Sequence, residues 1–444
     1  MINLFDYYTV ASRDLQFSLE TAGLHLPTVV IHDDGFLPRD VQSPLEFFLQ
    51  EAGTELIGKP RYFNQIDLPK FWEIDANGVE GRILDKGRLR GHITYSGGDR
   101  RFVKQVEWND RGGVIRSIDH YNQWGQKYAV TTLTPQGQPA LTTYFTPRGK
   151  ELLVLNHGSG SYVYHRPDGR EQYFASLASL VGYYLRAAKL PVEQVNFNSL
   201  ATPILTIQSM GQAVQFHRLF WQEPIQSEVP GNMKFILSGH LGKGEVVVQS
   251  RADYERLKQL LPANPAVKYL GYVYPFQRLN QQRKTILILT NSDQVVGLEE
   301  LANQLPDFSF AVAAVTEMSS HLMELDRLAN VHLYPTVSIE KARQLLAEAD
   351  IYLDINRGKE ILDAVRGAFE NNLLILGWQS TLHAARYVAA DHCFIEGQIG
   401  EMVGMLRAVY SQPNALENAL QEQWRAADRE LPQAYRDYFR RALN

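Results

Sequence analysis

The feature that most constrains the fold is an alternation of strand-type and helical segments between residues 175 and 444. Short aliphatic runs, such as residues 285–289 (TILIL), alternate with amphipathic segments of helical periodicity, such as residues 339–349. Strands that alternate with helices predict parallel, doubly wound sheets. A polar stretch at residues 278–283 interrupts the alternation. The sequence therefore predicts two Rossmann-like domains of the α/β class.

Residues 63–174 have a different sequence pattern, in which turn signals separate strand-type runs. The turn dipeptides include Asn77-Gly78, Lys86-Gly87, Gly97-Gly98, Gly112-Gly113 and Asp168-Gly169. This pattern predicts an antiparallel β-meander. A helical pattern at residues 11–22, with Ser12 as the expected N-cap, and a strand pattern at 28–32 come before it. Because the α/β pattern resumes afterwards, the meander is predicted to be an insertion in the first domain.

These sequence patterns predict the domain boundaries. The first Rossmann-like domain comprises residues 1–60 and 176–280, with the meander at 61–175, and the second comprises residues 281–425. Residues 426–444 are predicted to form a C-terminal helix that packs back on the first domain. Two such domains usually hold a ligand in the cleft between them. The cleft could equally be a plain domain interface.

Composition excludes several classes of protein. Lysine plus arginine minus aspartate plus glutamate is 44 − 49 = −5, and a protein that binds nucleic acid needs a basic surface. One cysteine, Cys393, rules out an intrachain disulfide. The start lacks a basic segment followed by an apolar run, and no stretch has the length of a membrane span. We therefore expect a cytoplasmic protein that inserts into no membrane.

Motifs that hold phosphates, metals or nucleophiles are missing from the sequence. It contains no G-x-G-x-x-G, no G-x-x-x-x-G-K-[ST] and no G-x-S-x-G. Gly242-Lys243-Gly244 precedes a strand-type run instead of opening a helix. The histidines, His383 and His392 among them, show no metal-ligand spacing, which favours a structural role. The sequence predicts no metal and no cofactor.

Several longer stretches are characteristic of one family. They are INLFDYYTVASRDLQFSLETAGLHLPTVVIHDDGFLP, SPLEFF, RYFNQIDLPKFWEI, HYNQWGQKYA, LTTYF, FWQEPI and YLDINRGKEILDAVRGAFENNLLILGW. Together they resemble the accessory, stabilising subunits of the bacterial protein O-GlcNAc transferases that act on serine-rich-repeat adhesins. The resemblance covers essentially the whole chain.

The resemblance implies a fold and a role. It implies the two-Rossmann GT-B glycosyltransferase fold with an inserted meander. It also implies a related catalytic subunit as partner, in a heterotetramer of two plus two. Such subunits bind the unfolded serine-rich acceptor and stabilise and activate the partner, which attaches the first GlcNAc from UDP-GlcNAc to serine or threonine. They work beside an accessory Sec system, so peripheral membrane association through partners is expected.

The residues allow a check on whether this chain transfers sugar itself. Catalytic retaining transferases of this fold carry Glu-x7-Glu, and the matching positions here are Ile355 and Asp363. Residues 285–326 contain no lysine or arginine, although this segment should hold the donor diphosphate. One unit charge at 4 Å contributes roughly 4 kcal/mol at an effective dielectric near 20, so donor binding should be weak. We predict no catalytic residue. An active transferase that uses Arg357, Glu360 and Asp363 is the alternative.

Residues near the carboxyl ends of predicted strands are candidates for acceptor binding, because open α/β sheets bind ligands there. Trp offers a large apolar area, and Gln and Asn can pair with a peptide backbone. Core packing of the tryptophans and local ion pairs are the competing interpretations. The predicted acceptor-binding residues are Trp221, Gln222, Glu223, Asn291, Arg357, Glu360, Trp378 and Gln379.

Aromatic residues of the meander are candidates for the interface with the catalytic subunit, because Trp and Tyr are enriched in binding hot spots. The predicted interface residues are Trp108, Tyr121, Trp124 and Tyr144. Packing against the sheet's own apolar face is the competing interpretation. A third functional hypothesis is a structural chaperone that binds the catalytic subunit and not the acceptor.

Overall fold

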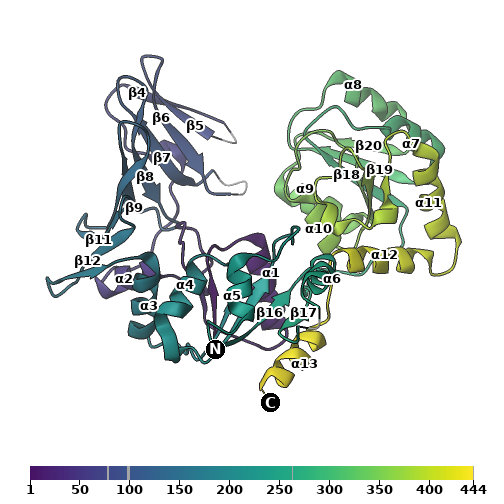
Figure 1. Cartoon of the computed structure of the whole chain (residues 1–444). Helices are drawn as coiled ribbons and strands as arrows, with labels where there is room; N and C mark the ends of the chain where they lie inside the picture. The colour runs from purple at the N-terminus through teal and green to yellow at the C-terminus, as the bar shows by residue number, and fades with distance from the viewer. Residues whose placement is uncertain (78–79, 98–100, 263, 444) are drawn as a thin grey trace. The chain divides into compact units, whose positions relative to one another are not determined.

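The computed structural model describes residues 1–77, 80–97, 101–262 and 264–443 (Figure 1). The predicted turn residues Gly78 and Gly98 lie outside these ranges. The chain divides into two compact units, Met1–Leu270 and Gly271–Asn444. Among the described residues, no helix has both the length and the apolar character needed to cross a membrane. Each unit is built around its own parallel sheet.

Unit 1 contains a parallel sheet of seven strands in the order β17-β16-β15-β14-β1-β2-β3. β1 lies inside the sheet, between β14 and β2, and its four residues are all buried. The strands are β1 (Ile2–Phe5), β2 (Thr28–Val30), β3 (Val41–Gln42), β14 (Gln194–Phe197), β15 (Phe216–Trp221), β16 (Lys243–Val248) and β17 (Val267–Tyr269). The helices are α1 (Val10–Thr21), α2 (Pro44–Glu51), α3 (Leu177–Ala187), α4 (Thr202–Met210), α5 (Gly231–Leu237) and α6 (Arg251–Leu260).

Helix α1 begins earlier than predicted. Its N-cap is Thr9, whose hydroxyl accepts a hydrogen bond from the Ser12 amide at 3.2 Å. Ser12 is therefore the third helical residue and not the cap, and its hydroxyl accepts from the Thr9 amide at 3.2 Å. This reciprocal capping box satisfies two amides that a helix start would otherwise leave unpaired. It fixes the segment that connects β1 to α1.

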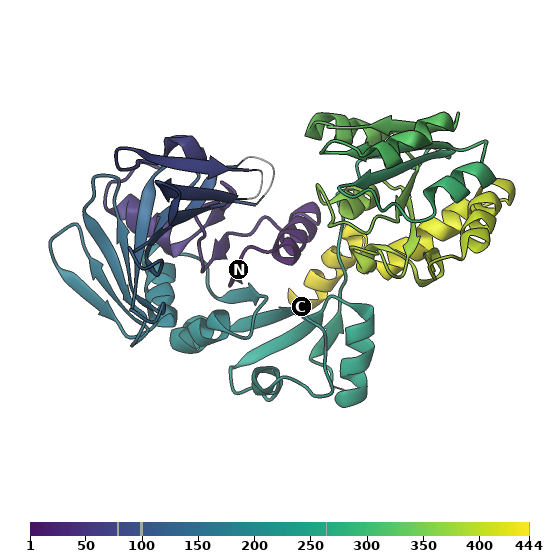
Figure 2. The ribbon, with the colours of Figure 1, turned by 90° about the horizontal axis from the view of Figure 1, so that it is seen from above.

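The meander follows β3 and α2 and returns to β14. Ten strands pair in chain order, each antiparallel to the next, and Figure 2 shows them as one continuous sheet. They are β4 (Trp72–Ala76), β5 (Glu80–Asp85), β6 (Arg88–Tyr95), β7 (Val103–Asn109), β8 (Ile115–Tyr121), β9 (Lys127–Leu133), β10 (Pro139–Phe145), β11 (Glu151–Asn156), β12 (Ser161–His165) and β13 (Glu171–Phe174). Leu153 and Tyr164 of its last strands join the core of the parallel sheet, whereas Ile83, Ile93 and Val106 form a separate core.

Unit 2 contains a parallel sheet of six strands in the order β20-β19-β18-β21-β22-β23. The strand order reverses between β18 and β21, and helices cover both faces (Figure 1). The strands are β18 (Thr285–Thr290), β19 (Ser309–Ala314), β20 (Val331–Tyr334), β21 (Ile351–Asp354), β22 (Leu374–Trp378) and β23 (Cys393–Phe394). The helices are α7 (Leu298–Gln304), α8 (Ser320–Met323), α9 (Ile339–Glu348), α10 (Ala364–Glu370), α11 (Ile399–Ser411), α12 (Ala415–Ala426) and α13 (Pro432–Leu443).

Two helices expected in unit 2 differ from the prediction. The segment 382–389 forms no α-helix and instead contains a short 3-10 turn at Ala385–Tyr387, and a second 3-10 turn follows it at Ala390–His392. The helix expected at 360–369 begins only at Ala364, because Leu362 and Asp363 adopt left-handed φ angles of 56° and 49° that interrupt helical hydrogen bonding. The α/β class, with parallel sheets and an antiparallel meander, is confirmed. The predicted domain boundaries and the packing of the C-terminal helix stay predictions.

Candidate functional site

In unit 1, polar side chains gather at the carboxyl edge of the parallel sheet. They follow the ends of five strands directly or after one residue: Asp6, His32, Asn198, Gln222 and Gln249. This edge is where open α/β sheets bind ligands. The alternating sequence pattern therefore brings residues from distant parts of the chain into one polar cluster.

Gln222 lies at the centre of this cluster. Its amide nitrogen donates to the Ala11 carbonyl at 2.9 Å and to Oε1 of Gln249 at 2.7 Å. Asn198 donates to Oε1 of Gln222 at 3.2 Å and to the Ser12 hydroxyl at 2.9 Å. These bonds use both amide hydrogens of Gln222. In this structure Gln222 positions the loops after β14, β15 and β16 and the start of α1.

The neighbours of Gln222 differ in exposure. Trp221 is 5% exposed and packs in the core of unit 1. Its indole nitrogen is buried without a hydrogen-bond partner among the described residues. Glu223 is exposed. Of the three residues predicted here, Glu223 is thus the one whose side chain faces solvent. Trp221 packs in the core beneath this edge of the sheet.

A second group at this edge was missed by sequence reasoning. The Asp6 carboxylate is 6% exposed, and its Oδ1 lies 3.4 Å from Nε2 of His32. The ring of Tyr7 stacks on the His32 imidazole, with centroids 4.4 Å apart and an angle of 9° between planes. The available signal was the position of these residues directly after strand-type runs.

In unit 2, the predicted residues lie at the corresponding edge of the second sheet. Asn291 follows β18 and is exposed, and its side-chain oxygen lies against Gly358. Arg357 is exposed and forms an ion pair with Glu396. Glu360 is half-buried, and its carboxylate accepts a hydrogen bond from the Val365 amide at 2.9 Å. Burial raises the pKa of Glu360. Asn291 thus lies in the loop after β18, whereas Arg357 and Glu360 lie in the loop between β21 and α10 and contact different partners.

Trp378 and Gln379 lie at the end of β22. Trp378 is the last residue of that strand and not, as predicted, a residue after it. It is fully buried, and its indole nitrogen donates to the Val296 carbonyl at 2.9 Å. In this structure Trp378 packs the core, so it presents no surface to an acceptor. Gln379 is exposed, and its backbone N–H donates a hydrogen bond to the Phe394 carbonyl at 2.7 Å.

A histidine fixes the loop between β21 and α10. Nδ1 of His383 lies 2.6 Å from Oδ1 of Asp354, and its Nε2 lies 2.7 Å from the Gly358 carbonyl. Because a carbonyl only accepts, Nε2 carries a proton. Burial opposes the charged form of His383, but the hydrogen bonds to Gly358 and Asp354 outweigh it and raise the pKa of His383. The loop that carries Arg357 and Glu360 is thereby pinned to the sheet.

The region that would hold a sugar donor has unsuitable chemistry. Ile355 is fully buried in the core of unit 2, and Asp363 is exposed. A pocket of about 380 Å³ opens beside the start of α7, lined by the carboxylates of Asp293, Glu299 and Glu300 and by no described lysine or arginine. Arg327 pairs with Glu299, but Asp293 and Glu300 leave negative charge at this place, which repels a diphosphate. The geometry therefore fits the predicted loss of donor binding.

The meander residues predicted at the partner interface are only partly accessible. Trp108, Trp124 and Tyr144 are half-buried, and Tyr121 is 5% exposed. The indole nitrogen of Trp108 donates to Oδ2 of Asp119 at 3.0 Å. Other large apolar side chains in and around the meander are more exposed, namely Tyr62, Phe71, Leu89, Val114, Leu141 and Tyr173. The interface assignment stays a prediction.

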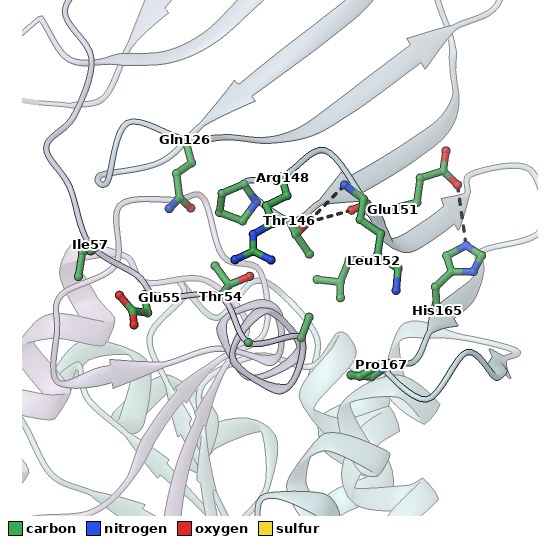
Figure 3. A pocket seen from close by; sticks show the side chains of 14 residues that line it. Thr54, Glu55, Ile57, Gln126, Thr146, Arg148, Glu151, Leu152, His165 and Pro167 are labelled. Carbon is green, nitrogen blue, oxygen red and sulfur yellow. Dashed lines mark hydrogen bonds and ion pairs between the residues drawn. The ribbon is translucent and has the colours of Figure 1, made fainter.

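A pocket of about 660 Å³ lies between the end of α2 and the turns of the meander (Figure 3). Arg148 points toward Thr54 and Glu55, which follow α2. On the other side, Glu151 and His165 form an ion pair at 4.0 Å. Charges of both signs line the pocket, so its electrostatics favour no single class of ligand.

Comparison with known proteins covers nearly the whole chain. Four family models match in order. They are described as the GtfB N-terminal domain (residues 2–48), the GtfB middle domain (72–175), the GtfB third domain (178–260) and the GftB/GlyA-F C-terminal domain (286–423).

Individual relatives agree with these matches. The Streptococcus gordonii UDP-N-acetylglucosamine–peptide N-acetylglucosaminyltransferase stabilizing protein GtfB is 40% identical over 432 residues, which cover 96% of each chain. A crystal structure of a GtfA/B complex bound to UDP and GlcNAc matches with a TM-score of 0.94 and 38% identity, over 99% of each chain. The pneumococcal O-GlcNAc transferase GtfA in complex with UDP and GlcNAc matches with a TM-score of 0.54 and 13% identity, over 99% of this chain and 98% of that chain, which shows the shared glycosyltransferase fold. Sequence and fold together place the chain in the GtfB family of N-acetylglucosaminyltransferase stabilizing proteins.

Proposed function

We propose that the chain is the non-catalytic accessory subunit of a protein O-GlcNAc transferase. The observation that carries this proposal is the full-length similarity, at 40% identity, to a relative named as a stabilizing protein of such an enzyme. In this role the chain stabilises and activates a catalytic glycosyltransferase subunit. The partner attaches the first GlcNAc from UDP-GlcNAc to serine or threonine.

The chemistry of unit 2 supports a non-catalytic role. An isoleucine side chain at position 355 cannot hydrogen-bond a donor sugar, and it lies buried in the core. Asp293 and Glu300 place negative charge at the start of α7, where a diphosphate would need positive charge, and Glu299 is paired with Arg327. Arg357, which could have compensated, pairs with Glu396. The alternative, an active transferase, has no comparable support.

The chain also binds the serine-rich-repeat acceptor polypeptide in this proposal. In unit 1, Glu223 contacts the acceptor directly, and Trp221 and Gln222 hold the loops at the carboxyl edge of the sheet in place. In unit 2, Asn291, Arg357 and Gln379 are exposed, and Glu360 holds the start of α10. An unfolded acceptor needs exposed side chains that can pair with its backbone, and these residue types supply them.

The assembly and its location complete the proposal. The chain joins the catalytic subunit in a heterotetramer of two plus two, with Trp108, Tyr121, Trp124 and Tyr144 of the meander near the interface. It works in the cytoplasm beside an accessory Sec system, and it reaches the inner face of the membrane through its partners.

Intact-protein mass spectrometry tests the proposal. A serine-rich acceptor is incubated with UDP-GlcNAc and with this chain, with the catalytic partner, or with both. N-acetylhexosamine should be added only when the partner is present, and more of it when both are present. Addition by this chain alone would establish the active transferase instead. Alanine at Arg357, Glu360 and Asp363 would then abolish transfer.

A further inference from the structure

The carboxyl ends of β1 and β2 carry a carboxylate, an imidazole and an aromatic ring in contact. Asp6 and Tyr7 follow β1, and His32 lies two residues after β2. Asp6 is buried, the His32 side chain is 35% exposed, and Tyr7 is 55% exposed. The group therefore runs from the interior to the surface at the edge where this fold class binds ligands.

The buried carboxylate orients the imidazole. Oδ2 of Asp6 accepts a hydrogen bond from the Ser199 hydroxyl at 3.0 Å. Oδ1 of Asp6 has no hydrogen-bond partner among the described residues, and Nε2 of His32 is 3.4 Å away. An unpaired buried oxygen favours a donor, so the neutral imidazole keeps its proton on Nε2. Nδ1 is then left as an acceptor, as in the Asp–His pairs that hold a hydroxyl in other proteins.

A small cavity opens beside this imidazole. Its volume is about 90 Å³, and His32 and Asp33 line it together with two tyrosines, Tyr144 and Tyr162, and with apolar residues such as Leu153 and Leu180. A water molecule takes about 30 Å³, so the space suits a side chain of a few heavy atoms. The Asp33 carboxylate accepts from the Gly35 amide at 2.7 Å and from the Ser43 hydroxyl at 2.5 Å. His32 is the residue of the lining that offers an imidazole nitrogen to a ligand.

The aromatic ring beside His32 is held in place by the backbone. The Tyr7 carbonyl accepts a hydrogen bond from the Ser12 hydroxyl at 2.8 Å, within the capping box of α1. The ring stacks on the imidazole with one face, which fixes the imidazole plane. Tyr7 therefore offers a fixed aromatic surface beside His32, against which an extended polypeptide can lie at low entropic cost.

We propose that Asp6, His32 and the adjoining cavity form a subsite for the hydroxyl-bearing side chain of a serine or threonine in the acceptor. Nδ1 of His32 accepts a hydrogen bond from the hydroxyl, Asp6 holds the imidazole in the required tautomer, and the cavity encloses the side chain. The subsite rests on the proposed function, since it requires that the chain bind acceptor. Asp6 is a positioning residue, and His32 is the contact.

The test measures peptide affinity with the full chain. One peptide is serine-rich, and the other has the same length with every serine replaced by alanine. The wild-type chain should prefer the serine peptide. Loss of one hydrogen bond changes affinity about fivefold, so His32→Ala should lower the preference about fivefold. Asp6→Asn keeps the side-chain volume but offers a donor to Nε2, which moves the imidazole proton, and it should lower the preference similarly. His25→Ala, at an exposed histidine before β2, is the matched control and should leave the preference unchanged.

Each outcome separates the subsite from the proposed function. If the wild-type chain binds neither peptide, acceptor binding by this chain is wrong and the subsite falls with it. If the wild-type chain prefers the serine peptide and both variants keep that preference, acceptor binding stands and the subsite is refuted. Thermal unfolding of each variant shows that the binding measurements report on folded protein. A purely structural Asp6–His32 pair would lower the unfolding temperature without changing the serine-over-alanine ratio.

Discussion

Replacing His383 with alanine should destabilise the chain by about 3 kcal/mol near pH 6. Asp354 is 1% exposed, and its carboxylate is held by Nδ1 of His383 at 2.6 Å and by the amide of the same residue at 2.8 Å. The variant keeps the amide and removes the imidazole. Removing one partner of a buried ion pair costs about 3–5 kcal/mol. The lower end applies because the His383 side chain is 16% exposed, so water replaces part of the lost interaction.

The effect should depend on pH in a defined direction. The folded pKa of His383 is raised above its usual value of 6.5, and the carboxylates of Asp354 and Glu360 face the ring. A raised pKa means that protonation stabilises the folded chain. The contribution of His383 is complete below its unfolded pKa and is lost as pH rises through the folded pKa. The difference between wild type and His383→Ala should therefore shrink from pH 6 toward alkaline pH.

Urea denaturation at several pH values measures this difference, and hydrogen exchange of residues 355–363 reports on the loop directly. The loop should exchange faster in the variant, since the 2.7 Å bond to the Gly358 carbonyl is lost. His332→Ala, at an exposed histidine of β20, is the control and should change neither quantity. Equal stability of His383→Ala and wild type at pH 6, or a gap that is the same at pH 6 and pH 9, would refute the reasoning.

Three further predictions concern unit 2. Asp350 is fully buried and pairs with Arg278 at 2.7 Å and Arg283 at 2.8 Å, so Asp350→Ala should cost about 3–5 kcal/mol in urea denaturation. Burial opposes the charge of Asp350, but hydrogen bonds from the two arginines lower its pKa, so this stabilisation should be present above the usual pKa of 3.8 and be lost as pH falls through the lower folded value. Trp378→Ala should cost about 3–5 kcal/mol, measured in the same way, because it empties a core position. Ile355→Glu should lower the unfolding temperature without creating UDP-GlcNAc binding in calorimetry, because it buries an unpaired carboxylate and because no described lysine or arginine lines the pocket at the start of α7.

Much of the architecture could be predicted because it depends on local pattern. Buried parallel strands such as residues 285–289 are continuous apolar runs, and these are visible in a single sequence. The meander is recognisable from the turn dipeptides that separate its strands. Its strands also pair with chain neighbours, so their order needs no long-range information. Neither the apolar runs nor the turn pattern depends on the exact residue at which a strand or helix ends.

Short elements and loop geometry could not be predicted in the same way. β1 at Ile2–Phe5 and α2 at Pro44–Glu51 have too few residues to show a period. The late start of α10 depends on the left-handed conformation of Leu362 and Asp363. Aspartate tolerates this conformation better than most residues, but leucine does not favour it. Tertiary contacts impose such a conformation, and the sequence pattern does not contain them.

The sequence predicted where the candidate site residues lie in the fold, but it did not predict which groups their side chains contact. Following the ends of strands located Gln222 and Asn291 at sheet edges, because the rule depends only on topology. Whether a side chain is free depends on what folds against it. Gln222 is bonded to Ala11 and Gln249, and Trp378 is buried against Val296. These contacts join residues far apart in the chain, so no local pattern marks them.

The insertion of the meander has a consequence for how the chain folds as it is synthesised. β1 is an interior strand of the unit 1 sheet, and its residue Ile2 pairs with Val195 of β14, so the ribosome must make the whole meander before this pairing can form. Each meander strand pairs with the strand before it, and such local contacts form quickly. The meander should therefore fold first, and until β14 has been made, the edge of β1 that pairs with it stays without a partner strand. A nascent chain in that state is prone to aggregate, and its exposure time is set by the length of the insertion.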